Sequence, residues 1–493
     1  MKKTVHITAP DKIGTIAPEI YGHFSEHIGG VFYGGIWVGK DSKIPNIGGF
    51  RKDFIEKFKK INPPVLRWPG GCFAEVYNWR DGIGKNRPTR INWWTVNDGR
   101  YEPNEVGTHE FMELCEILET KPYLAVNVTS ITPMEARDWL DYCLSPRGST
   151  TLAKLREENG HAEPFDIPYF GVGNENWGDG GNMTPEYYAL EFRRFATVMD
   201  NVPSANKKSM ICGGANGGDY NWTRKLAESL STTRRTLQDG MSIHYYCGKV
   251  GDAVDFTEEE WYEMLTKAYK MDDIINRHYA ILEGYKTENS MKLVIDEWGC
   301  WHPDGSGPSE GYNLFEQQST MRDALVSAIT LNIFNNQCKK IKMANVAQVC
   351  NNLHALFLAD EEHLITTPTY HVFDMFKGHQ GGEALRAFAE DNEDIEKRLS
   401  LSASVKDGVM TLTLANCSAT EDIEASLNLM GAKFNGELEV ALLEGEQLNS
   451  HNTFDAPDAV TPKYFTLDAG TETVTVPKAS VVCITAKITE NQY

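Results

Sequence analysis

Two glutamates in this chain each end a short apolar segment and precede an aromatic residue. Residues 170–178 read FGVGNENWG and deliver Glu175, and residues 292–299 read KLVIDEWG and deliver Glu297. Both apolar runs are too short for a helix and are closed by glycine, so they favour strands. A carboxylate at the end of each strand is the arrangement by which a parallel barrel presents catalytic groups.

The chemistry that two such carboxylates suit is glycoside hydrolysis. One carboxylic acid protonates the leaving oxygen, and a second, ionised carboxylate meets the developing oxocarbenium ion. Glu175 suits the acid because its approach is apolar and Trp177 is adjacent, and Glu297 suits the nucleophile. Tyr246 could donate a hydrogen bond that keeps Glu297 ionised, and Asn174 could bond the sugar hydroxyl beside the anomeric carbon.

Eight apolar or alternating segments, separated by stretches with helical periodicity, are the candidate strands that position these residues. They are residues 19–27, 65–68, 123–127, 169–173, 210–214, 242–246, 293–297 and 344–348. Amphipathic segments such as residues 50–61, 105–118 and 133–144 supply helices between them. The alternation predicts an α/β fold, a (β/α)8 TIM barrel over residues 16–384 with catalytic groups at the C-terminal strand ends.

Past residue 384 the pattern changes to alternation with period two. The alternating segments are residues 398–405, 409–414, 471–476 and 480–486. Residues 406–408, Lys-Asp-Gly, read as a hairpin turn. We therefore predict a C-terminal antiparallel β-sandwich domain over residues 385–493, joined by an N-terminal strand from residues 1–15. It carries no obvious catalytic cluster, so we expect a structural companion to the barrel.

Further candidate site residues lie at or just after the predicted strand ends: Glu26, Cys72, His244 and Gln348. Plainer interpretations remain open for three of them. Glu26 could be a solvated surface acid, His244 a core histidine, and Cys72 a small packed residue with no base beside it. Strand alternation also places Asp296 on the face opposite to Glu297, which favours buried hydrogen bonding over catalysis.

The sequence indicates neither a cofactor nor a metal. The glycine-rich residues 29–35 lack the Lys-Ser/Thr of a phosphate-binding loop and the spacing of a dinucleotide fingerprint, and the histidines show no HExxH or i, i+4 pairing. A formal net charge of -21 argues against nucleic acid, an anionic membrane surface or polyanionic substrates. The eleven tryptophans suit flat ligands such as sugar rings.

The lack of a recognisable secretory signal and the pattern of cysteines lead us to expect a cytoplasmic protein. The N-terminal residues hold two lysines but no apolar run of secretory length, and no window of the chain reaches transmembrane length. The ten cysteines are scattered without metal-type spacing. Free thiols in a reducing compartment are therefore the expectation.

Five stretches together resemble the α-L-arabinofuranosidases of glycoside hydrolase family fifty-one: GVGNENWG, VIDEWG, LRWPGGCFAEVYNWRDGIG, SIHYY and NVAQ. The likeness covers barrel and sandwich alike. It implies retaining hydrolysis with Glu175 as acid/base and Glu297 as nucleophile. It also implies that the protein is metal-free, commonly hexameric, and intracellular when it trims arabino-oligosaccharides.

The resemblance also assigns a binding pocket. The residues that would hold the terminal arabinofuranose are Glu26, Cys72, Asn174, Tyr246 and Gln348, with His244 beside them. Four tryptophans would wall the pocket or its leaving-group side: Trp94, Trp177, Trp298 and Trp301. Two alternatives stay open, namely a β-xylosidase or endo-glucanase on a related barrel, and a non-catalytic sugar-binding protein.

Overall fold

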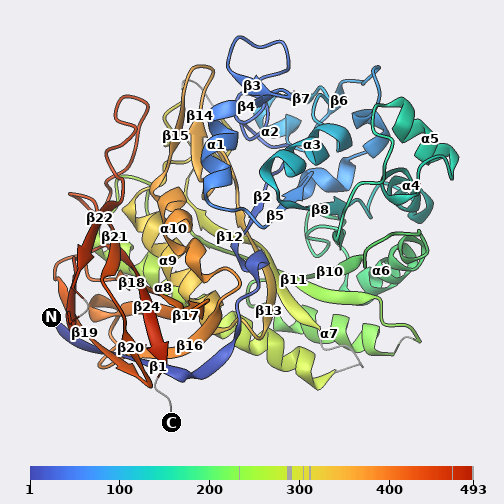
Figure 1. Cartoon of the computed structure of the whole chain (residues 1–493). Helices are drawn as coiled ribbons and strands as arrows, with labels where there is room; N and C mark the ends of the chain where they lie inside the picture. The colour runs from blue at the N-terminus through green and yellow to red at the C-terminus, as the bar shows by residue number, and fades with distance from the viewer. Residues whose placement is uncertain (233, 286–290, 304, 310–312, 469, 491–493) are drawn as a thin grey trace.

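The computed structural model describes residues 1–493 except residues 233, 286–290, 304, 310–312, 469 and 491–493. Eight parallel strands close into a barrel in the order β2, β5, β8, β9, β10, β11, β12, β13 (Figure 1). Their bounds are β2 Gly22–Phe24, β5 Val65–Trp68, β8 Lys121–Val126, β9 Tyr169–Val172, β10 Ser209–Asn216, β11 Gln238–Gly248, β12 Lys292–Trp301 and β13 Ile341–Ala347. Each overlaps one predicted segment, so the predicted barrel is confirmed.

Helices pack around the barrel: α1 Lys52–Lys60, α3 Thr108–Leu118, α4 Pro133–Leu144, α5 Thr151–Glu158, α6 Pro185–Asp200, α7 Tyr220–Ser231, α8 Glu258–Gly284, α9 Met321–Asn336 and α10 Pro368–Phe376. Proline begins α4, α6 and α10, and in each the preceding threonine hydroxyl accepts the N–H three residues on. Within the described ranges, no helix is long and apolar enough to cross a membrane.

The first predicted strand, residues 19–27, is wrong in its extent. Pro18 begins a 3-10 helix, η1 (Pro18–Tyr21), and only Gly22–Phe24 pairs with the neighbouring strands β13 and β5. Proline has the fixed φ that suits the first turn of a helix and has no N–H to donate to a sheet. The chain therefore turns before it enters the barrel, and Glu26 follows just beyond a short strand.

A bulge on β12 sets the direction of its polar residues. From Ser242 to His244 β11 advances two residues, whereas β12 advances three over the same distance, from Val294 to Glu297. The pairing of β12 with β13 shows an extra residue on β12 as well, because β12 advances three residues from Ile295 to Trp298 while β13 advances two. A bulge resets the alternation of a strand, so Asp296 and Glu297 both project into the barrel.

The predicted opposite orientation of Asp296 is therefore wrong, although its predicted hydrogen-bonding role is confirmed. Asp296 accepts a bond from the Tyr123 hydroxyl at 2.9 Å and one from Asn345 Nδ2 at 3.4 Å, both inside the barrel. These bonds satisfy a carboxylate that is 3% exposed, directly beneath Glu297.

An excursion between β5 and α3, which the sequence did not predict, carries Trp94 to the barrel mouth. It contains η2 (Cys72–Val76), η3 (Trp79–Gly82), β6 (Arg90–Ile91), α2 (Thr95–Asp98) and β7 (Tyr101–Glu102). His27 fastens it to the barrel, because its Nδ1 lies 3.0 Å from Glu102 Oε2 and its carbonyl accepts from Asn92 Nδ2 at 3.0 Å.

The C-terminal domain of antiparallel strands is confirmed, and the N-terminal strand belongs to its sheet. The order is β22-β21-β24-β18-β17-β16-β1-β19-β23, with β20 on β24. The bounds are β1 Lys2–Thr15, β16 Glu383–Ala389, β17 Leu399–Lys406, β18 Val409–Asn416, β19 Ile423–Met430, β20 Ala432–Phe434, β21 Leu438–Leu443, β22 Lys463–Leu467, β23 Thr473–Val476 and β24 Val481–Glu490. In Figure 1 the blue β1 lies beside these orange and red strands.

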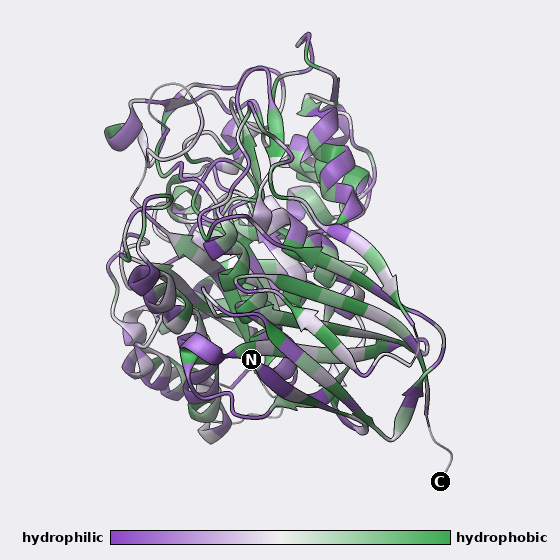
Figure 2. Cartoon of the chain, turned by 90° about the vertical axis from the view of Figure 1, so that its left-hand side faces the viewer, coloured by the Kyte–Doolittle hydropathy of each residue, from purple (hydrophilic) through white to green (hydrophobic). Residues whose placement is uncertain are grey.

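Two details of this sheet are a hairpin turn set by local sequence and a mixed pairing of strand β1. Asp407 and Gly408 both have positive φ, 51° and 76°, as a two-residue hairpin turn between β17 and β18 requires. Strand β1 pairs antiparallel with β16 but parallel with β19, so the sheet is not wholly antiparallel. The division of the chain at residues 15 and 384 stays a prediction. Figure 2 shows hydrophobic residues recurring along these strands.

Candidate active site

Glu175 and Glu297 meet at the C-terminal end of the barrel. Glu175 follows β9, Glu297 lies on β12, and a carboxylate oxygen of each lies within 4.8 Å of the other and of a ring nitrogen of His244. His244 Nδ1 is 2.9 Å from Glu175 Oε1 and 3.4 Å from Glu297 Oε2. Two glutamates more than a hundred residues apart in the sequence thus lie close enough for both to contact one anomeric carbon.

Glu297 is held as an anion. Arg67 Nη1 donates to its Oε1 at 2.8 Å, and the Tyr246 hydroxyl donates to its Oε2 at 2.9 Å. Burial alone would raise the pKa of Glu297, but the charges of His244 and Arg67 outweigh it and lower the pKa below the usual carboxyl value. An ionised carboxylate is what a nucleophile needs.

His244 is not a plain core histidine, since it bridges the two carboxylates. Burial alone would lower its pKa, yet the charge of Glu297 and the contact with Glu175 raise it above the ordinary histidine value. The imidazole therefore carries positive charge more readily here than in water, and it shares that charge with both glutamates.

Glu26 is buried, 3% exposed, and not a solvated acid. Its carboxylate accepts from Phe73 N at 2.9 Å, from Trp94 Nε1 at 3.1 Å and from Gln348 Nε2 at 3.2 Å. Burial, with the nearby charge of Glu297, raises the pKa of Glu26 to about 7 although the N–H of Phe73 opposes the shift. Such a carboxyl can both accept from and donate to a sugar hydroxyl.

Glycine is required where the chain passes Glu26. A Cβ on Gly71 would lie 2.5 Å from Glu26 Oε2, closer than any side chain can approach. The Pro-Gly-Gly-Cys run therefore lets the η2 turn approach the carboxylate. The next residue, Cys72, is thereby placed against the acid.

Cys72 and Asn174 complete the floor beside Glu175. The Cys72 thiol lies 3.9 Å from Glu175 Oε2 and 3.9 Å from Asn174 Nδ2, and Asn174 Oδ1 accepts from Arg67 Nη2 at 2.6 Å. Burial and the surrounding carboxylates raise the pKa of Cys72, so it stays a neutral thiol and not a nucleophile. A neutral thiol can offer a weak hydrogen bond to a bound hydroxyl.

Aromatic rings line the mouth on the side of the β12 loop. The Trp94 ring centroid is 5.8 Å from Phe315, Phe315 is 5.0 Å from Trp301, and Trp301 is 5.1 Å from Tyr246. Trp301 is 38% exposed. Trp177 is half-buried two residues after Glu175. The rings offer the flat apolar faces on which a sugar can stack.

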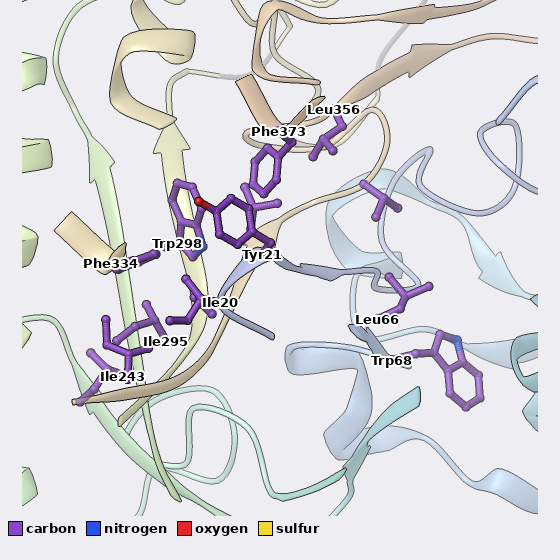
Figure 3. Packing of buried hydrophobic residues seen from close by; sticks show 14 of the residues in the cluster. Ile20, Tyr21, Leu66, Trp68, Ile243, Ile295, Trp298, Phe334, Leu356 and Phe373 are labelled. Atoms are coloured by element: carbon purple, nitrogen blue, oxygen red, sulfur yellow. The ribbon is translucent and has the colours of Figure 1, made fainter. Parts of the chain in front are cut away.

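Trp298 does not belong to this wall, and its predicted place there is wrong. It is 1% exposed, and its ring packs 5.5 Å from Phe334 of α9 and 6.2 Å from Phe373 of α10. Figure 3 shows it in the buried hydrophobic cluster that also contains Tyr21, Phe334 and Phe373. Strand alternation is the physical reason, because the residue after an inward Glu297 points outward into the helical layer.

Sequence reasoning missed three residues of the site. Arg67 donates to both Glu297 and Asn174. Its signal was available, since an arginine in the otherwise apolar run Val-Leu-Arg-Trp must find a buried anion. Glu75 hydrogen-bonds the loop that carries Glu175. Phe315 sits between two tryptophans, and nothing in its neighbourhood marked it.

Two side-chain clusters among the described residues have the spacing to hold a metal ion. One is Glu175, His244 and Glu297, and the other is the buried set Cys300, His302 and Asp323. In the second, the Arg322 guanidinium Nη2 lies 3.3 Å from His302 Nδ1, and its positive charge disfavours a cation there. His302 Nε2 already pairs with Asp323 at 3.0 Å.

A (β/α)8 barrel with two carboxylates facing one anomeric centre, one of them held ionised, defines a glycoside hydrolase. Comparisons with known proteins give the finer class. Residues 57–251 match the family described as "Alpha-L-arabinofuranosidase 1 domain", and residues 296–480 match the "Alpha-L-arabinofuranosidase C-terminal domain".

Whole-chain relatives agree. An intracellular exo-alpha-L-arabinofuranosidase of Bacteroides ovatus is 38% identical over 98% of this chain and 94% of that protein. The crystal structure of a GH51 arabinofuranosidase from Xanthomonas axonopodis pv. citri has a TM-score of 0.91 at 35% identity, covering 99% of this chain and 100% of that one. A thermostable GH51 α-L-arabinofuranosidase from Thermotoga petrophila RKU-1 has a TM-score of 0.86 at 26% identity, with 98% and 100% covered. The chain belongs to the α-L-arabinofuranosidases of glycoside hydrolase family 51.

Proposed function

We propose that this chain is a retaining, exo-acting α-L-arabinofuranosidase that releases terminal arabinofuranose from arabino-oligosaccharides or fragments of arabinoxylan and arabinan. The observation that carries the proposal is the distance within 4.8 Å between oxygens of Glu175 and Glu297. Retaining enzymes hold their carboxyl groups about 5–5.5 Å apart, whereas inverting enzymes leave about 6.5–9.5 Å for a water molecule.

The reaction proceeds by two displacements. Glu175 protonates the glycosidic oxygen while Glu297 attacks the anomeric carbon, so the bond to the leaving group breaks as the glycosyl–enzyme ester forms. Glu175 then removes a proton from water, which attacks the same carbon and releases arabinose with its configuration retained. Arg67 and Tyr246 aim the nucleophile, and Asn174 holds the hydroxyl beside the anomeric carbon.

The remaining residues of the site would hold one terminal sugar. Glu26, Gln348 and Cys72 supply hydrogen-bonding groups at the floor, and His244 stands beside both carboxylates. Trp94 and Trp301, with Phe315 between them, would flank the sugar and its leaving group, and Trp177 would face the leaving-group side. This division into a polar floor and an aromatic rim suits a chain end.

The test of this function is a comparison of substrates with product analysis. We expect hydrolysis of 4-nitrophenyl α-L-arabinofuranoside, release of arabinose alone from arabinoxylan, and an initial anomer with the substrate's configuration by proton NMR. Preferred cleavage of 4-nitrophenyl β-D-xylopyranoside, or oligosaccharides released from cellulose, would instead select the β-xylosidase or endo-glucanase. Sugar binding without turnover would identify a non-catalytic protein.

The low pKa of Glu297 predicts a pH effect of His244→Asn. In the native protein the carboxylate stays ionised to a pH below its usual range, because His244 and Arg67 outweigh burial. Removing the imidazolium raises that pKa, so the acidic limb of the kcat/KM profile should move to higher pH. The profile is measured on the aryl arabinofuranoside. An acidic limb that stays in place or moves downward would contradict the assignment.

We further propose that the enzyme works in the cytoplasm, in hemicellulose and arabinan breakdown, as a homo-oligomer and by resemblance a hexamer. The name of the Bacteroides relative and the ten free cysteines support the compartment. Ile91, Val96 and Tyr101 support the assembly: they are 77%, 90% and 62% exposed on the excursion that carries Trp94. Apolar side chains this exposed suit contact with another subunit.

A further inference from the structure

Glu75 is a fully buried carboxylate that takes no part in the reaction described above. It lies on the η2 turn that follows β5, 0% exposed. Its Oε1 accepts from Asn174 N at 2.7 Å and Asn176 Nδ2 at 3.0 Å. Its Oε2 accepts from the backbone N–H groups of Val128 at 2.8 Å and Thr129 at 3.0 Å. One side chain thus joins the ends of three successive barrel strands, β5, β8 and β9.

The two Oε1 partners are the residues on either side of Glu175. Glu175 itself has φ +43°, in the left-handed region that a glutamate rarely adopts. Such a conformation costs about 1–3 kcal/mol and persists only where the surroundings fix it. Glu75 holds the chain on both sides of this strained residue, while Gly178 N and Gly180 N bond its carbonyl at 2.8 and 3.1 Å.

Two glycines let the loop pass close to its own polar groups. A Cβ on Gly173 would lie 2.3 Å from Asn176 Oδ1, and one on Gly180 would lie 1.7 Å from the Asn174 carbonyl. Asn176 Nδ2 also donates to the Gly180 carbonyl at 2.7 Å. The conformation of Glu175 is therefore set by a tight ring of bonds in which Glu75 is the one charged acceptor that faces all four N–H donors.

Burying a carboxylate is costly, so its presence here calls for a reason. Burial raises the pKa of Glu75, and the N–H groups of Asn174 and Val128 oppose that shift. An apolar residue would fill the space more cheaply but would remove this acceptor from four N–H groups. Thr129 N and Asn176 Nδ2 have a second acceptor, whereas the backbone N–H groups of Asn174 and Val128 would lose the one that Glu75 supplies. Those four groups all lie in the two loops that flank the acid/base.

We propose that Glu75 is a positioning residue for Glu175: its carboxylate fixes the left-handed conformation that directs Glu175 at the leaving-group oxygen. The inference rests on the proposed function, because it takes Glu175 as the acid/base. Glu75 does not touch the sugar. It acts through the backbone of Asn174 and the side chain of Asn176.

The test is Glu75→Gln with substrates that differ in their need for acid catalysis. The amide turns one oxygen into a donor that faces two N–H groups, so the loop loses acceptors without losing volume. For methyl α-L-arabinofuranoside, whose alkoxide must be protonated as it leaves, we expect kcat/KM to fall about 10- to 100-fold. For the 2,4-dinitrophenyl glycoside, which leaves unaided, we expect a loss below about threefold.

Two further variants keep the test decisive. Glu110→Gln is the matched control, because Glu110 is also buried and also accepts a backbone N–H, from Gly107 at 3.0 Å on the outer helix α3. It should leave the ratio of the two kcat/KM values unchanged. Asn176→Ala removes one Oε1 donor and keeps Glu75, so it should shift the ratio in the same direction by less.

A purely structural role predicts a different result. Equal losses on both substrates, no loss on either, or failure of both Glu75→Gln and Asn176→Ala to fold would overturn the proposal. Glu175→Ala separates this failure from failure of the function. If Glu175→Ala shows the leaving-group dependence of a lost acid and Glu75→Gln does not, only the role of Glu75 falls.

Discussion

Glu297→Ala is expected to lower kcat on 4-nitrophenyl α-L-arabinofuranoside by about 10⁵- to 10⁶-fold, the scale seen when a covalent nucleophile is removed. Even a good leaving group needs the nucleophile, because no ester forms without it. The change also leaves Arg67 Nη1 and the Tyr246 hydroxyl without the anion they bond. Steady-state kinetics of the variant and the native protein measures the effect. Their thermal unfolding temperatures show whether the variant is folded.

Azide gives this variant a stereochemical control. In the space vacated by the carboxylate, azide can attack the anomeric carbon in a single displacement and yield a glycosyl azide of inverted configuration. The product is identified by NMR. Turnover of Glu297→Ala close to that of the native protein, with the fold intact, would remove Glu297 from the mechanism.

Glu175→Ala is expected to show the second largest effect, and one that depends on the leaving group. For arabino-oligosaccharides kcat/KM should fall about 10²- to 10⁴-fold, the usual contribution of a general acid. Activated aryl glycosides should be spared in kcat/KM, because their leaving groups need no proton. Their kcat should fall instead, since water then attacks the glycosyl–enzyme ester without a general base.

Added azide should restore kcat of Glu175→Ala on the aryl substrate, because azide needs no base. The product should be a glycosyl azide of retained configuration, since two displacements have occurred. The opposite configurations expected from the two variants assign the two roles independently of rate. An inverted azide from Glu175→Ala, or an equal loss on all leaving groups, would contradict its role as acid/base.

Most of the barrel could be predicted because each strand has a recognisable apolar or alternating pattern in its own sequence. The apolar run Leu293–Ile295 and the alternating segment around Ser242 indicate strands whatever residues lie across the barrel. The extent of the first strand could not be predicted in this way, because Pro18 begins a 3-10 helix that takes up the first residues of the predicted segment. The excursion with β6, α2 and β7 was missed because its two-residue strands are too short for any periodicity to develop.

The site was predictable where a residue type sits at a strand end, and not where geometry depends on distant partners. Glu175, Glu297, His244 and Tyr246 fall in the first class, and the structure brings them together. Asp296 falls in the second, because strict alternation gives it the wrong face once one extra residue enters β12. Trp298 follows the inward Glu297 and points outward as alternation requires, so its predicted place on the pocket wall is wrong for a local reason. The role of Glu75 could not be predicted, because its four hydrogen-bond donors lie about 50 to 100 residues further along the chain.

The pairing of β1 with β16 and β19 imposes an order on folding during synthesis. Strand β1 ends at Thr15, whereas its parallel partner β19 ends only at Met430, so β1 is synthesised about 415 residues before that partner is complete. At about 5–20 residues per second, it waits on the order of 20–90 s with its backbone groups unpaired. The barrel can close during that interval, so the C-terminal domain is completed last, and the nascent chain carries an exposed, aggregation-competent strand until then.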